Sequence, residues 1–341
     1  MTLDSVIAGR RSRFRRRAVI IAILGIAVFV AYAVTLMVGQ TFYSPGEVVQ
    51  VILGQQVPGA SFTVGTLRLP RATLGLLAGA AFGLAGVTFQ TLLRNPLASP
   101  DVIGISAGAS AAAVFAGVTL GLGDREVSIF ALVAALITAG TIYLLSYKAG
   151  FSGIRLILIG IGVGAMLDSL ITYLLSRAAA WDLQVAMQWL TGSLNGASWE
   201  RVLPLLVVVA LFGPLLMGSS RSFAALHLGD DSAAALGVRT NRTRLLMILA
   251  AVILLAFATA ASGPIAFVAF MAGPIAARIV GPGGSLMLPA ALVGALLVLV
   301  ADLIGQFAFG TRYPVGVITG VLGAPYLIYL LIRNNRAGGS L

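Results

Sequence analysis

The stretch at residues 10–38, RRSRFRRRAVIIAILGIAVFVAYAVTLMV, decides the fold class. Six arginines precede an apolar run, Ala18–Val38, that contains no charged residue. A helix needs about 20 apolar residues to cross a bilayer. This run is longer than the roughly 7–15 apolar residues of a signal peptide, and no small-x-small cleavage site ends it. We therefore predict an uncleaved first membrane-spanning helix with a basic segment before it.

Composition extends this conclusion to the whole chain. Of 341 residues, 59% are apolar and 10% are charged, against roughly 45–50% and about 25% in soluble domains. So few charges exclude a soluble enzyme and a disordered chain. The lack of cysteine excludes disulfide scaffolds and thiolate metal sites, and the single His227 cannot build a metal site alone. Six of the 22 basic residues lie between Arg10 and Arg17, and the others are thinly spread and form no basic face, which argues against nucleic-acid binding.

The apolar runs predict an all-α polytopic membrane protein with about ten transmembrane helices in a compact bundle. Many of the 41 glycines lie four residues apart, as do Gly79 and Gly83, a spacing that lets helix backbones approach closely. Glycine and proline cross the run at 262–283, which we expect to be a short or broken helix packed against protein. The predicted helices are 18–39, 72–93, 102–120, 127–147, 154–176, 201–217, 244–262, 264–281, 286–307 and 314–333.

Basic residues predict the orientation. With ten spans, most of the 22 basic residues fall on the side of the N-terminus, and basic residues mark the cytoplasmic side of a membrane. We therefore expect a basic cytoplasmic tail at 1–17, a single transmembrane domain at 18–335 and a cytoplasmic tail at 336–341. Both termini are then cytoplasmic.

The sequence carries no motif for catalysis or nucleotide binding. It has no phosphate-binding loop, and its one lysine, Lys148, lies in Tyr-Lys-Ala-Gly. No zinc-protease, serine-hydrolase or paired-carboxylate pattern supports a membrane enzyme. Two acids, Asp168 and Asp302, fall inside predicted helices. Intramembrane acids are candidates for proton coupling or a polar path, but both lie toward helix ends, where a structural role is also open.

One polar segment is too long for a simple turn. Residues 218–244, GSSRSFAALHLGDDSAAALGVRTNRTR, lie on the predicted cytoplasmic side. Their pattern indicates two short helices that are broken at Gly229 and Gly237, with Asp230 and Asp231 placed to cap a helix start. The segment is either a solvated loop or a projecting knob that docks a cytoplasmic partner.

Five motifs resemble those of one family. They are RLPR at 68–71, FQTLLRNPLASPD at 89–101, WLTGSLNG at 189–196, LGDDSAAALGV at 228–238, and YPVGV at 313–317 with GAP at 323–325. As a set they are similar to the FecCD/BtuC-type permeases of bacterial ABC importers for iron–siderophores, heme and vitamin B12, over about residues 18–335. The motifs GSLNG and LGDD look most like a permease subunit of ferric-enterobactin importers. The chain departs from the family at 272–278, AGPIAAR, where many relatives carry Pro-His or Pro-Gln before Ile-Ala-Arg.

The resemblance implies a type II ABC importer permease fold in a bacterial cytoplasmic membrane. It implies a second permease subunit, a paralogue rather than an identical copy, two ATPase subunits that carry ATP and Mg, and an extracytoplasmic substrate-binding protein. The implied cargo is a ferric siderophore, with heme or vitamin B12 as the alternative. No cofactor, metal site or nucleic-acid partner is expected for this chain. Outside the family, an ion-coupled secondary transporter would use Asp168 and Asp302.

Residue roles on the outer side come from matching positions. Arg68 and Arg71 match the family's outward-facing arginine pair, which meets acids of the binding protein, and Arg312 falls near the outer end of the last span. Arginine suits this role because its guanidinium pairs bidentately with carboxylate. The alternative is that Arg68 and Arg71 only anchor a helix end at the headgroups.

Two further sets of residues follow from the resemblance. The family places the fifth and tenth spans near the pore, so Gly160, Gly162 and Gly164 are pathway or gate candidates, with ordinary helix contact as the alternative. These glycines are expected to leave one flank of the fifth helix thin. The ATPase-coupling candidates are Leu228, Gly229, Asp230, Asp231, Ala235, Leu236 and Gly237.

Overall fold

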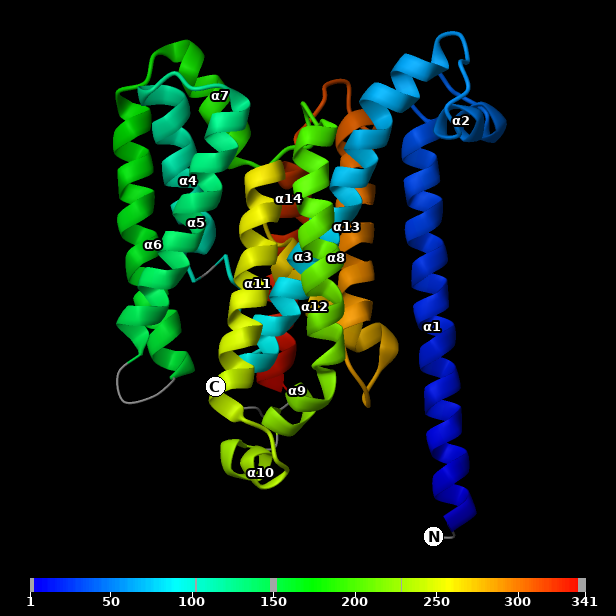
Figure 1. The fold of residues 1–341 in the computed structure, drawn as a ribbon, viewed down its shortest axis with the longest axis vertical. Coiled ribbons are helices and arrows are strands. Elements are labelled where there is room, and N and C mark those ends of the chain that lie inside the picture. Colours follow the sequence, from blue (N-terminus) through cyan, green and yellow to red (C-terminus); the bar gives the residue numbers. More distant parts are fainter. Residues whose placement is uncertain (1–2, 102, 148–151, 228, 337–341) are drawn as a thin grey trace.

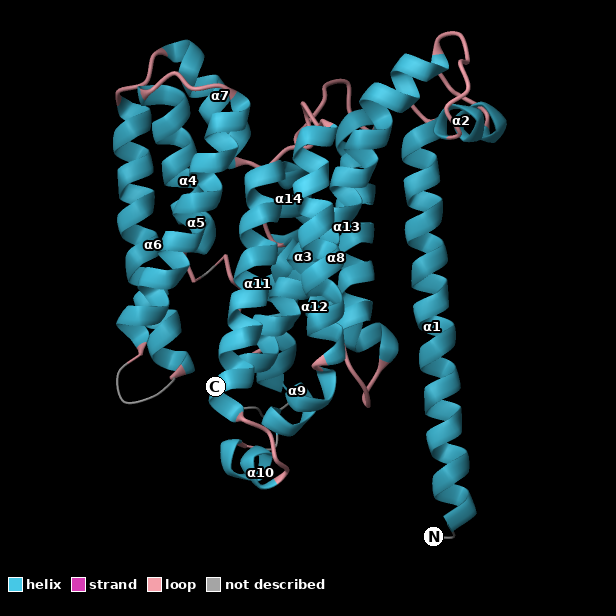
Figure 2. Ribbon diagram, viewed as in Figure 1, coloured by secondary structure: helices cyan, strands magenta, loops and turns pink. Residues whose placement is uncertain are grey.

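The computed structural model describes residues 3–101, 103–147, 152–227 and 229–336. All regular elements in these ranges are helices (Figure 2). The elements are α1 (Leu3–Met37), α2 (Pro45–Ile52), η1 (Ser61–Arg68), α3 (Leu69–Leu92), α4 (Ile105–Val114), η2 (Phe115–Thr119), α5 (Asp124–Ser146), α6 (Gly153–Ser176), α7 (Ala180–Leu190), α8 (Trp199–Gly218), α9 (Ser220–His227), α10 (Asp230–Ala235), α11 (Thr240–Ser262), α12 (Val268–Val280), α13 (Met287–Phe307) and α14 (Val315–Arg336).

The predicted polytopic membrane fold is confirmed. Among the described residues, eight helices are long and apolar enough to cross a membrane, and two apolar helices, Ile105–Thr119 and Val268–Val280, are shorter. Together they account for the ten predicted spans. The second begins earlier than predicted, at Ser61 instead of 72, because η1 runs directly into α3. Pro70 does not end this helix because it lies in the first turn of α3, where proline is tolerated.

The run at 262–283 forms a short helix packed against protein, as predicted. This helix, α12, is 13 residues long and mostly buried. Pro274 lies inside it and leaves the carbonyl of Phe270 without its helical donor. The buried side chain of Gln90 on α3 supplies the missing bond, with Nε2 at 2.9 Å from the Phe270 oxygen. A side chain from a neighbouring helix thus satisfies the break that proline makes.

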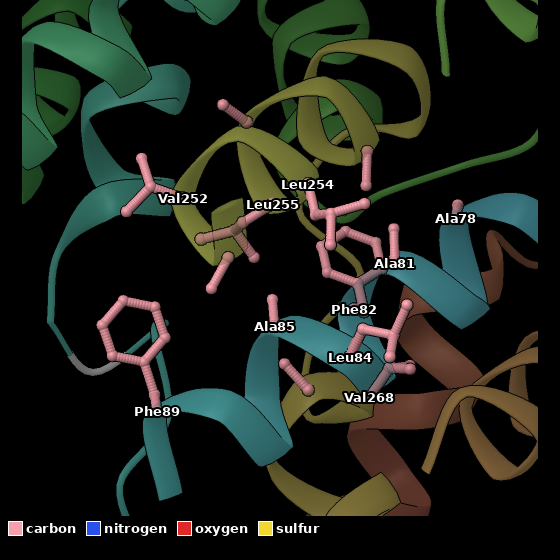
Figure 3. Close-up of a cluster of buried hydrophobic side chains, with 14 of the residues drawn as sticks. Ala78, Ala81, Phe82, Leu84, Ala85, Phe89, Val252, Leu254, Leu255 and Val268 are labelled. Carbon is pink, nitrogen blue, oxygen red and sulfur yellow. The ribbon is translucent and has the colours of Figure 1, made fainter. Parts of the chain in front are cut away.

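Helix α3 lies at the centre of the molecule. It is buried along most of its length and packs against α8, α11, α12 and α13. Gly79 faces Gly294 of α13 so closely that a Cβ on either residue would collide with the other backbone. Phe82, Leu254 and Leu255 fill the space between α3 and α11 (Figure 3). The glycine spacing therefore produces close helix contact at the core.

The bundle has two distinct ends (Figure 1). The N-terminus, α9, α10 and the final part of α14 lie at one end, which we call the α10 end. α2, α7 and the turn between α13 and α14 lie at the other, which we call the α2 end. Helices α4–α7 form one group, and α1 runs along the opposite side of the molecule.

Candidate functional site

The α2 end holds a cavity of about 500 Å³. It lies among the end of α1, the junction of η1 with α3, the loop before α8 and the end of α13. The three arginines predicted for docking, Arg68, Arg71 and Arg312, all line it. Arg71 is paired with Asp302, so Arg68 and Arg312 leave a net positive charge that favours anionic groups.

Arg71 is held by an ion pair at the edge of the cavity. Its Nε and Nη2 donate to the two carboxylate oxygens of Asp302 at 2.9 and 2.7 Å, and its Nη1 donates to Asn195 Oδ1 at 2.7 Å. Asp302 is 2% exposed and also accepts from Gln306 Nε2 at 2.7 Å. The carboxylate of Asp302 is therefore fully engaged, and the pair joins the first turn of α3 to the end of α13.

Arg68 caps the end of α1. Its guanidinium donates to the carbonyls of Leu36, Met37 and Thr41 at 3.0, 2.9 and 2.7 Å, and lies 5.1 Å from the ring centroid of Tyr43. A cation at this position satisfies carbonyls that have no helical donor. Arg68 thus lines the cavity and also anchors a helix end.

Arg312 differs from the other two arginines. It is exposed in the turn between α13 and α14 and forms no hydrogen bond or ion pair with another described residue. Its guanidinium is available to a carboxylate from another molecule.

The loop at 191–198 links the cavity to helices of the core. Asn195 accepts from Arg71, Ser193 N donates to the carbonyl that ends α11 at 2.8 Å, and Gly316 N donates to Gly192 O at 3.1 Å. Leu194 is buried against α3. The sequence marked this loop as a motif without assigning it a role, and it missed Asn195 and Gln306 as partners in the arginine network.

The segment at the α10 end forms the two predicted short helices. Gly229, at φ +108°, precedes α10, and Gly237, at φ +83°, follows it. Helix α10 ends with two hydrogen bonds, in which Gly237 N donates to Ala234 O and Val238 N donates to Ala233 O. Asp231, Ala235, Leu236 and Gly237 are exposed, and Leu236 is 65% exposed. Leu228 lies outside the described residues, and Asp230 is placed in the first turn of α10.

The side chain of Arg94, just after the end of α3, contacts α9 at the start of this segment. Arg94 Nη2 donates to the carbonyl of Leu226 on α9 at 2.6 Å. Arg94 follows the end of α3 and has a positive φ of 49°, which turns the chain sharply. Since Arg71 lies in the first turn of α3, this helix runs from the arginine cavity to the support of α9.

The three pathway glycines do not lie on one flank, contrary to the prediction. Gly160 packs on Ile103, and Gly104 approaches the Gly160 and Gly164 backbones. Gly162 has open space around its Cβ position and is exposed. Residues two positions apart are about 200° apart around a helix, so Gly162 faces away from the other two.

Among the described residues, His, Asp and Glu do not gather in groups that could hold a metal ion. The described residues instead place basic side chains around the cavity at one end and an exposed apolar side chain, Leu236, on the segment at the other.

Comparison with known proteins agrees with this geometry. The family model described as the FecCD transport family matches residues 22–333. The chain belongs to this family. The ferric enterobactin transport system permease protein FepG of Escherichia coli is 42% identical over 89% of this chain and 90% of its own length. The ferric enterobactin transport system permease protein FepD of Escherichia coli is 34% identical over 94% of this chain and 97% of its own length.

The fold of this FecCD-family permease is also found in a solved structure. A chain described as an inward-facing conformation of a metal-chelate type ABC transporter superposes with a TM-score of 0.82 and 27% identity, covering 92% of this chain and 99% of that one. The protein is therefore a multi-pass permease of a bacterial cytoplasmic membrane.

Proposed function

We propose that this chain is the permease subunit of an ABC importer that moves a ferric siderophore into the cytoplasm, driven by separate ATPase subunits. The similarity to FepG, a ferric enterobactin permease, supports the cargo. The arginine cavity and the projecting α10 segment lie at opposite ends of the molecule. This placement is the observation that supports separate contacts with a binding protein outside and with ATPase subunits inside. In this proposal the α10 end and both termini are cytoplasmic.

The exposed face of α10 is the proposed contact with an ATPase subunit. Leu236 is an apolar side chain that is 65% exposed on a projecting segment, where burial by a partner would be favourable. Asp231, Ala235 and Gly237 lie beside it in sequence and are also exposed. We assign this contact to the whole set of predicted coupling residues, Leu228, Gly229, Asp230, Asp231, Ala235, Leu236 and Gly237.

The arginine cavity is the proposed docking site for acids of an extracytoplasmic binding protein. Arg312 is the direct partner because its guanidinium has no bond to the described residues. Arg71 and Arg68 shape the cavity while their side chains hold α13 and α1, and Arg68 adds positive charge because no carboxylate among the described residues offsets it as Asp302 offsets Arg71. Exchanging the charge at Arg312 therefore tests docking with little effect on folding.

A second permease subunit completes the proposed pore. Within the most apolar 18-residue stretch of each helix, 22% of the residues are buried in α6 and 33% in α14. Each helix therefore leaves a face for another chain or lipid. Gly162 and Asp168 lie on the exposed face of α6. The presence of two similar permeases, FepG and FepD, in one system supports a paralogue as this partner.

Transport by the purified complex in proteoliposomes tests this proposal. We expect uptake of ferric enterobactin only when the ATPase subunits and ATP are present, and we expect Arg312→Glu to weaken binding-protein docking without loss of ATPase assembly. Gly237→Trp is expected to leave insertion intact and to uncouple ATP hydrolysis from uptake. Uptake without ATPase subunits would favour an ion-coupled transporter, and uptake of only heme or a corrinoid would contradict the cargo.

A further inference from the structure

The basic part of α1 extends beyond the ends of the membrane helices that it packs against. Arg17 donates to the carbonyl of Gly283 at 2.8 Å and to that of Ser285, in the turn between α12 and α13. This contact sets Arg17 level with the ends of two packed helices. Arg11 lies about 9 Å further along the helix axis, at 1.5 Å per residue, and a headgroup layer is roughly 5–7 Å thick. With the helix ends at the membrane surface, Arg15 and Arg16 lie within that layer, and the long side chain of Arg11 reaches back to it from just outside.

The arginines of α1 divide into two faces. Arg17 and the buried residues Leu24 and Val28 mark the face toward the bundle. Arg11, Arg15 and Arg16 lie away from this face and line one groove with Ser12 and Val19, and Ile20 lies where the groove borders the bundle. These three arginines are exposed and pair with no acid among the described residues.

An apolar stripe continues directly from this basic groove. Val19, Ile23, Ile26 and Val30 are 51%, 58%, 63% and 51% exposed. At about 100° per residue they share the face of Arg11, Arg15 and Arg16. A cationic groove at headgroup depth, followed by an apolar stripe within the membrane, matches the shape and charge of a phospholipid with an anionic head.

We propose that this face of α1 is a binding site for an anionic phospholipid of the cytoplasmic leaflet. The phosphate lies among the guanidinium groups of Arg11, Arg15 and Arg16, and an acyl chain follows Val19, Ile23 and Ile26. Juxtamembrane arginines attract anionic lipid in this way, at roughly a fivefold gain in affinity per residue. The inference rests on the membrane embedding of the family and on the proposed cytoplasmic N-terminus, and it is independent of the cargo.

The test measures lipid binding to the purified importer complex by native mass spectrometry during titration with phosphatidylglycerol or phosphatidylcholine. We expect the triple variant Arg11→Gln/Arg15→Gln/Arg16→Gln to lose about 100-fold in phosphatidylglycerol affinity, while phosphatidylcholine binding is unchanged. Arg13→Gln is the control, because Arg13 is exposed on the side of the helix that carries Arg17, and it is expected to change affinity less than fivefold. Lysine at the three positions is expected to retain most of the binding.

Three results would overturn the proposal. The first is an unchanged phosphatidylglycerol affinity in the triple variant. The second is a loss of phosphatidylglycerol affinity in Arg13→Gln as large as the loss per arginine at the groove positions. The third is a triple variant that loses an ATPase subunit and keeps its lipid, which would show that a protein covers the groove. If the triple variant does not assemble, a single cysteine at Val19 with a fluorophore provides a second measurement. Spin-labelled phosphatidylglycerol is expected to quench it more than spin-labelled phosphatidylcholine, and equal quenching would contradict the site. A negative result in these lipid measurements would not contradict the proposed siderophore transport, which is measured separately.

Discussion

The two ends of α3 are held in different ways. At the α2 end, Arg71 makes three charged hydrogen bonds to Asp302 and Asn195, and Asp302 is almost fully buried. At the α10 end, the contacts of Arg94 include a hydrogen bond to the backbone carbonyl of Leu226 on α9, and the helix beyond it is largely exposed. The difference is that a buried ion pair fixes the arginine cavity within the chain, whereas the α10 segment projects with an exposed apolar side chain, Leu236, that the proposed partner would cover.

The largest expected effect comes from removing one member of the buried ion pair. Arg71→Met leaves the Asp302 carboxylate buried without its partner, which typically costs about 3–5 kcal/mol. Thermal unfolding of the purified complex measures this loss. The double variant Arg71→Met/Asp302→Leu removes both charges and is expected to recover most of the stability. Equal stability of the single variant and the native protein would show that the pair is not formed.

The second change weakens the support of the α10 segment. Arg94→Gln removes a charged hydrogen bond to Leu226 O, which is worth about 1.5–3 kcal/mol. We expect faster amide hydrogen exchange in α9 and α10 and no change around the arginine cavity. Arg221→Gln is a matched control, since Arg221 is exposed on α9. Uniform exchange changes across the chain would contradict a local role.

A third change tests whether α3 is also fixed between its ends. Gln90→Leu leaves the Phe270 carbonyl, already freed by Pro274, without a donor, at a cost of about 1–3 kcal/mol. The unfolding temperature of the complex is expected to fall, with faster hydrogen exchange confined to α12. Gln55→Leu serves as the control because Gln55 is exposed outside the core. An unaltered unfolding temperature in Gln90→Leu would show that the break in α12 needs no support from α3.

The smallest expected effect is at α2. Ser44 and Glu47 form a capping box, and hydrogen bonds from Ser44 lower the pKa of the Glu47 carboxyl. Because the lowered pKa means that the ionised form is stabilised in the folded helix, its contribution is present above the ordinary glutamate pKa and is lost as pH falls through the lowered value. Glu47→Gln is expected to remove this acid sensitivity of hydrogen exchange in α2. Identical acid sensitivity in the variant would contradict the cap.

Sequence patterns predicted the membrane helices and the two helices of the α10 segment, because apolar runs and glycine breaks are local signals. The start of the second span was missed because the polar residues of η1 interrupt the apolar pattern before Arg68. Asp302 was recognised as an intramembrane acid, but its pairing with Arg71 joins residues 231 positions apart, which no local pattern encodes. The same holds for Gln90 and Phe270, which are 180 positions apart.

In the proposed importer the arginine cavity and the α10 segment act on opposite sides of the membrane. The chain has no cysteine, so single cysteines at Leu236 and Thr311 can be labelled without interference. In sealed right-side-out vesicles that contain the whole importer, we expect an impermeant maleimide to label Cys at 311 from outside and not Cys at 236, and we expect the latter to cross-link to the ATPase subunit. Labelling of Cys at 236 from outside, or its cross-linking to the binding protein, would contradict the account.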